Sequence, residues 1–90
     1  MHFTSSSGKI ELNITKEQAL QGSHSGSCDA DIAELRTVPS IRRQLDKLKP
    51  EIVAAELSEY GAWDDEELQD HDKNLSRLLW IACGDISENA

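Results

Sequence analysis

The stretch of sequence that decides the fold is residues 64–87, which read DDEELQDHDKNLSRLLWIACGDIS. Apolar residues recur in it at spacings of seven, four, three and four, as on one face of an α-helix. Asp64 followed by Glu67 is typical of a helix start, because each side chain can cap the backbone of the other. The stretch therefore predicts one long C-terminal helix over about residues 65–87. Its expected core residues are Leu68, Leu75, Leu79, Ala82 and Ile86, with Leu78 and Trp80 widening the face.

Two prolines mark the starts of shorter helices before this stretch. Pro39 and Pro50 each suit a first helical turn, where the N–H group that proline lacks would have no partner in any case. They predict helices over residues 39–48 and 50–60, with Gly61 as the stop after the second. The expected apolar stripes of these helices are Ile41, Leu45 and Leu48, and Val53, Leu57 and Tyr60.

Two further helices are indicated by their caps. Thr15 and Gln18 resemble a capping box for a helix through Gln21, which Gly22 would end. Ser27 or Asp29 can cap the next helix. That helix is expected over residues 30–38 with Ile32, Leu35 and Val38 facing one way, so that residues 28–60 form a series of short helices.

The N-terminus is predicted to be an arm. Residues 1–8 are rich in serine and are expected to be disordered. Residues 9–15 alternate, with Ile10, Leu12 and Ile14 on one side, which predicts a short strand. A lone strand must pair either with a second copy of the chain or with an edge elsewhere in this one. Because no other segment alternates convincingly, pairing between chains is the favoured expectation, with a possible homo-oligomer through residues 9–15. The predicted fold class is mainly α: one small helical domain over residues 9–90, with a β-strand arm at 9–15 and a long helix over 64–87.

The charge of the chain limits the classes of partner. Seventeen acidic residues against 9 basic ones give a formal net charge of −8 over 90 residues. Residues 61–90 carry 8 acidic and 2 basic residues, a net of −6, and residues 1–60 carry 9 and 7, a net of −2. This balance repels a phosphate backbone and argues against direct nucleic-acid binding. No stretch has the length and apolarity of a signal peptide or a membrane span, so a cytoplasmic protein with no membrane contact and reduced Cys28 and Cys83 is expected.

An acidic run provides the candidate partner-binding site. Six of the nine residues at positions 64–72 are acidic, and an aromatic residue precedes them. One interpretation is a docking surface with a tryptophan anchor. The favoured alternative is that the acids complement the helix dipole and form a solvated face, while Trp63 or Tyr60 packs in the core. The candidate residues are Trp63, Asp64, Asp65, Glu66, Glu67, Asp70 and Asp72.

Two other groups of residues suggest chemistry more weakly. His24 and Cys28 stand four apart beside Asp29 and Asp31, as in half a zinc site or a nucleophile with its base, although a capping segment with a half-buried cysteine explains them better. Residues 36–49 hold five basic residues, which could contact an acidic partner or phosphates, or be neutralised by the acidic helix. They are Arg36, Arg42, Arg43, Lys47 and Lys49. No catalytic residue, metal site or cofactor is assigned.

Four segments carry a resemblance to known sequences. They are residues 26–32 (GSCDADI), 39–45 (PSIRRQL), 61–68 (GAWDDEEL) and 78–86 (LLWIACGDI). Together they resemble small uncharacterised proteins of bacteriophage and prophage genomes, over residues 9–88. The resemblance implies a genomic setting in which short proteins bind and redirect host proteins, and it implies no mechanism or functional residue.

The expected function is therefore that of a non-catalytic accessory protein of phage or prophage type, acting by stoichiometric contact with a host or phage protein. The alternative is an acidic mimic of nucleic acid that inhibits a host defence or DNA-binding protein. A remote third interpretation is a small metal-dependent enzyme built on His24, Cys28 and His71.

Overall fold

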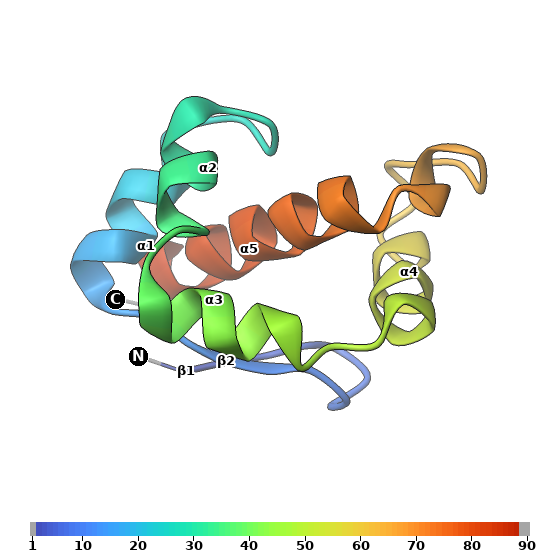
Figure 1. Ribbon diagram of the computed structural model, residues 1–90, viewed down its shortest axis with the longest axis horizontal. Coiled ribbons are helices and arrows are strands. Elements are labelled where there is room, and N and C mark those ends of the chain that lie inside the picture. Colours follow the sequence, from blue (N-terminus) through green and yellow to red (C-terminus); the bar gives the residue numbers. More distant parts are fainter. Residues whose placement is uncertain (1, 89–90) are drawn as a thin grey trace.

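The computed structural model describes residues 2–88, and its elements pack around one long helix, α5 (Figure 1). Met1 and residues 89–90, assigned above to the arm and to the domain, lie outside the described residues. The predicted fold class is confirmed: a helical domain with a short N-terminal β-arm and a long C-terminal helix. In chain order the elements are β1 (His2–Thr4), β2 (Glu11–Asn13), α1 (Lys16–Ser23), α2 (Ala30–Leu35), α3 (Pro39–Asp46), α4 (Pro50–Ser58), η1, a 3-10 helix (Glu67–Gln69), and α5 (His71–Glu88).

The core forms from the apolar face that the periodicity predicts. The expected core residues of α5 are at most 7% exposed, and they meet apolar residues from the hairpin and from helices α1 to α4. Val38 and Leu48 are only partly buried. Tyr60 was wrongly assigned to the core, because it lies beyond the end of α4 and is 46% exposed.

Helices α2, α3 and α4 each end two or three residues earlier than predicted. Each ends in a turn closed by a bond from an N–H to the carbonyl three residues before, such as Leu48 to Leu45 at 3.1 Å. The residues before the two prolines, Val38 and Lys49, are extended. This agrees with the clash that disfavours helical backbone before proline.

Gly22 was predicted to end α1, but it lies inside this helix. A Cβ atom at Gly22 would lie 2.5 Å from the Sγ atom of Cys83 on α5. Glycine is therefore needed here because α1 packs closely against α5. The predicted start of α1 is confirmed, since Thr15 and Gln18 form both hydrogen bonds of a capping box.

The arm is a hairpin closed within one chain, which corrects the expected disorder of residues 2–8. β1 and β2 pair antiparallel, with Phe3 opposite Leu12, and Gly8 takes a positive φ of 76° in the turn. Residues 2–8 are thus a strand and a turn, and not disordered. The strand predicted over residues 9–15 has its partner in β1, so the reason for expecting exchange between chains no longer holds. β1 was not predicted, because a three-residue strand with one buried side chain has too short a pattern to recognise.

The predicted long helix is interrupted at Asp70. Two buried side chains of α5 cause the break by bonding to backbone carbonyls that a continuous helix would need. Arg77 Nη1 donates to the carbonyl oxygen of Glu67 at 2.9 Å, and Asn74 Nδ2 donates to that of Leu68 at 2.8 Å. In an unbroken helix these carbonyls would accept from residues 71 and 72. The stretch from residue 65 therefore divides into η1 and α5.

Candidate functional site

Asp64 and Glu67 of the acidic run cap each other. Asp64 Oδ1 accepts from the Glu67 N–H at 2.8 Å, and Glu67 Oε1 accepts from the Asp64 N–H at 3.0 Å. The reciprocal cap was predicted, but it starts the turn that leads into η1 and not the long helix. Both carboxylates are thus engaged by the backbone.

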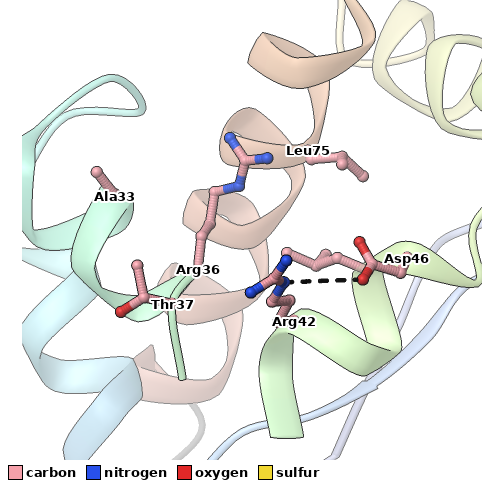
Figure 2. Close-up of a pocket in the computed structure, with 7 residues that line it drawn as sticks. Ala33, Arg36, Thr37, Arg42, Asp46 and Leu75 are labelled. Carbon is pink, nitrogen blue, oxygen red and sulfur yellow. Dashed lines mark ion pairs between the residues drawn. The ribbon is translucent and has the colours of Figure 1, made fainter. Parts of the chain in front are cut away.

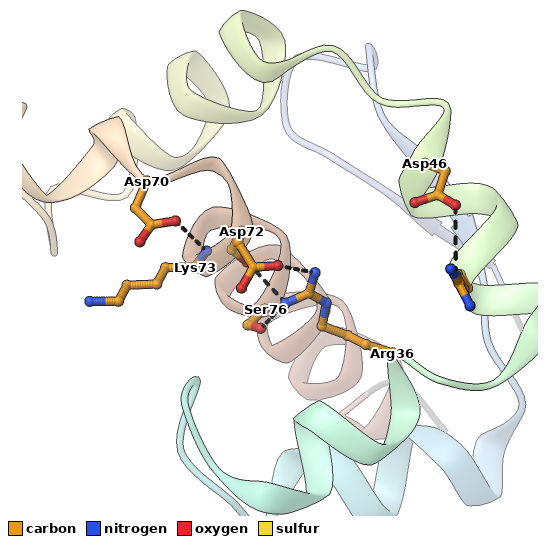
Figure 3. Close-up of polar contacts among 7 residues, drawn as sticks. Arg36, Asp46, Asp70, Asp72, Lys73 and Ser76 are labelled. Atoms are coloured by element: carbon orange, nitrogen blue, oxygen red, sulfur yellow. Dashed lines mark hydrogen bonds and ion pairs between the residues drawn. The ribbon is translucent and has the colours of Figure 1, made fainter.

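Asp70 and Asp72 stabilise the start of α5. Asp70 has extended backbone angles, and its Oδ1 atom accepts from the Lys73 N–H at 3.2 Å, as an N-cap does. Asp72 accepts from Arg36 Nη2 at 2.7 Å, and Arg36 Nη1 also donates to Ser76 Oγ at 2.9 Å (Figure 3). The hydrogen bond and charge of Arg36 lower the pKa of Asp72. Four of the six acids therefore have a structural role.

The connection between α4 and η1 presents the remaining acids. Asp65 and Glu66 are exposed there, and so is the Tyr60 ring. Figure 1 shows this connection at one edge of the molecule, away from α1, α2 and α3. We name Tyr60, Asp65 and Glu66 the corner surface. Desolvation and the carboxylates of Glu56, Asp85 and Glu59 raise the pKa of Tyr60, so its side chain is a neutral phenol at neutral pH.

Trp63 anchors the connection between α4 and η1 to the rest of the molecule. It is partly buried against the core, and the Arg77 guanidinium lies 5.3 Å from its ring centroid. Arg77 also donates to Asn74 Oδ1 at 2.9 Å. These contacts fix the shape of the connection. The helical periodicity did not predict that Arg77 is buried. Arg77 follows Leu75 by two residues, which is about 200° around the helix axis, and so it was expected on the polar side.

The basic residues at positions 36–49 are only partly neutralised by the acidic run. Arg36 is the point of contact, through Asp72. Arg42 has a longer pair, at 4.0 Å, with Asp46 of its own helix. Within residues 2–88, no ion pair joins Arg43, Lys47 or Lys49 to a carboxylate. Because these three side chains belong to exposed residues, α3 and the residues after it form a basic surface.

The weaker candidate residues do not come together. His24 follows the last residue of α1, Cys28 is exposed in the next loop, and His71 begins α5. In the described part of the chain, no three His, Cys, Asp or Glu side chains form a group that could hold a metal ion. Cys83 is buried, and burial raises the pKa of its thiol to about 11. That thiol is therefore protonated at neutral pH and packs as an apolar group.

Comparison with known proteins gave no match: no family model, curated protein or solved structure is similar to this chain. The resemblance to phage proteins thus stays a prediction. None of the helices in residues 2–88 combines the length and apolarity needed to cross a membrane.

Proposed function

We propose that this protein is a non-catalytic accessory protein of phage or prophage type that acts by stoichiometric contact with a host or phage protein through its corner surface. The observation that supports this most directly is that the exposed ring of Tyr60 and the exposed acids Asp65 and Glu66 belong to the same short connection after α4. An aromatic anchor with a charged rim is the usual composition of a binding hot spot.

Most groups of the predicted site are engaged within the chain and so are not available to a partner. Asp64, Glu67, Asp70 and Asp72 bond within the chain, and Trp63 packs on the core. A mimic of nucleic acid would need many free carboxylates in a regular array. With four of six engaged, an aromatic-centred contact is the better-supported function.

Affinity capture with matched variants tests the proposal. Tagged wild-type protein and Tyr60→Ala are incubated with bacterial lysate, and the captured proteins are quantified by mass spectrometry. We expect Tyr60→Ala to lose the captured partner, because truncating an aromatic hot-spot residue costs about 2 kcal/mol or more of binding.

Leu20→Ala is the control, because Leu20 is 39% exposed and is, with Tyr60, one of the two exposed large apolar residues in the described chain. It should retain the partner. Asp65→Asn with Glu66→Gln should weaken capture at low salt more than at high salt. Equal capture by wild type and Tyr60→Ala would exclude the corner surface.

A further inference from the structure

A groove lies on another part of the molecule, where α2, α3 and α5 meet. Its volume is about 410 Å³. Leu45 and Leu75, both at most 7% exposed, supply apolar surface at its floor. Figure 2 shows Arg36 reaching from the end of α2 toward α5, and Arg42 lying along α3 toward Asp46. Two guanidinium groups thus line the groove together with the Asp46 carboxylate, the Thr37 hydroxyl and the apolar residues Ala33, Leu45 and Leu75.

The two arginines differ in how firmly they are held. Arg36 makes three hydrogen bonds to Asp72 and Ser76, which fix its position and use three of the five N–H groups of a guanidinium. Arg42 is 72% exposed, and its 4.0 Å pair with the equally accessible Asp46 contributes little. An incoming carboxylate can replace Asp46 on Arg42 at low cost, beside a preorganised Arg36.

Charge around the groove favours an acidic occupant. Arg43, Lys47 and Lys49 continue the basic surface beyond Arg42, and in residues 2–88 they have no ion-pair partner. The net charge of −8 opposes the dense charge of a nucleic acid more than it opposes a single carboxylate of a peptide, and among residues 2–88 no aromatic ring lines the groove for base stacking. A bare anion could pair with Arg42 but would leave Leu45 and Leu75 uncovered, whereas an aliphatic side chain next to a carboxylate contacts them as well.

We propose that this groove binds a segment of a protein partner in which a carboxylate side chain stands next to an aliphatic one. The carboxylate pairs with Arg42 and the edge of Arg36, and the aliphatic side chain covers Leu45 and Leu75. This surface is separate from the corner surface, and the two can be tested independently.

Titration of the ¹⁵N-labelled full chain with a capped hexapeptide of alternating glutamate and leucine tests the proposal. We expect saturable changes in the amide resonances of Ala33, Thr37 and Leu75. Arg42→Gln should weaken binding about tenfold, because it removes a charge-assisted contact. Lys16→Gln is the matched control: it makes the same charge change at an exposed residue of α1, outside the groove lining and the basic surface, and should alter binding less than about twofold.

A second variant tests the groove itself. Ala33 lines it and is exposed, so Ala33→Tyr fills the hollow without changing the charge and should also reduce binding. Thermal melts of the variants confirm that each is folded. Equal losses in Arg42→Gln and Lys16→Gln would overturn the proposal. So would equal binding of the hexapeptide with glutamine for glutamate, equal shifts with inorganic phosphate, or tighter binding of a single-stranded oligonucleotide.

Discussion

At the scale of single residues, Glu56 joins two distant parts of the chain. It is 3% exposed, and the hydroxyls of Ser6 and Ser7 in the hairpin turn donate to its carboxylate. Burial raises the pKa of Glu56, but hydrogen bonds from Ser7, Ser5 and Ser6 together outweigh it, so the pKa lies below its ordinary value of 4.5. These partners are about fifty residues away in sequence, which is why the serines were predicted to be disordered.

This carboxylate predicts a pH dependence of stability. Because its pKa is lower in the folded state, Glu56 contributes stability that is fully present above pH 4.5 and is lost as the pH falls through the folded pKa. Glu56→Gln should therefore be less stable than wild type at neutral pH, and the gap should shrink in acid. Urea unfolding of both proteins at pH 7 and pH 3 measures this. Glu51→Gln, an exposed position on α4, should show no such gap, and a gap for Glu56→Gln that is unchanged at pH 3 would contradict the assignment.

At the scale of elements, the sequence correctly predicted the features that depend only on residues close together in the chain. The apolar face of α5, the capping box of α1 and the proline starts of α3 and α4 depend on neighbours within four residues, and all are confirmed. The break at Asp70 depends on side-chain bonds from Arg77 and Asn74 across ten and six residues. Nothing in the helical period reports such bonds.

The break gives Asp70 a role that its neighbours in the acidic run lack. As the N-cap of α5, it should cost about 1 kcal/mol of unfolding free energy when replaced by alanine. Asp70→Asn should restore most of this, since asparagine caps as well as aspartate does. Chemical denaturation provides the measurement, with Asp65→Ala as the control at an exposed acid of the connection. A loss in Asp65→Ala equal to that in Asp70→Ala would show that total charge, and not capping, matters.

At the scale of the whole molecule, the acidic residues and the basic residues have different roles, and the sequence alone did not distinguish these roles. The acids at positions 64–72 are mostly used to build the turn before α5, whereas Arg42, Arg43, Lys47 and Lys49 stay exposed and Arg36 pairs with Asp72. Net charge predicted an acidic protein, yet exposed basic residues extend along α3 beside a groove lined by Arg36, Arg42 and Asp46. The candidate site at Trp63–Asp72 could be located from composition, but which of its groups are free depends on the tertiary fold.

The hairpin completes the core within one chain, and this leads to a prediction about association. β1 pairs with β2, and Phe3, Ile10, Leu12 and Ile14 are all at most 3% exposed. With both strands present, no second copy is needed, so the full chain should scatter light as a particle of about 10 kDa at micromolar concentration. Deleting residues 2–7 removes β1 and leaves β2 with an open edge and uncovered apolar neighbours.

We expect that deletion to lower the melting temperature and to produce dimers or larger particles. Ser6→Gly is the matched control: it alters the exposed turn, keeps both strands, and should stay monomeric. If β2 paired between chains, the opposite pattern would appear. The full chain would be a dimer, and the deletion of residues 2–7 would leave both the dimer and its melting temperature unchanged, because β1 would contribute nothing to the pairing.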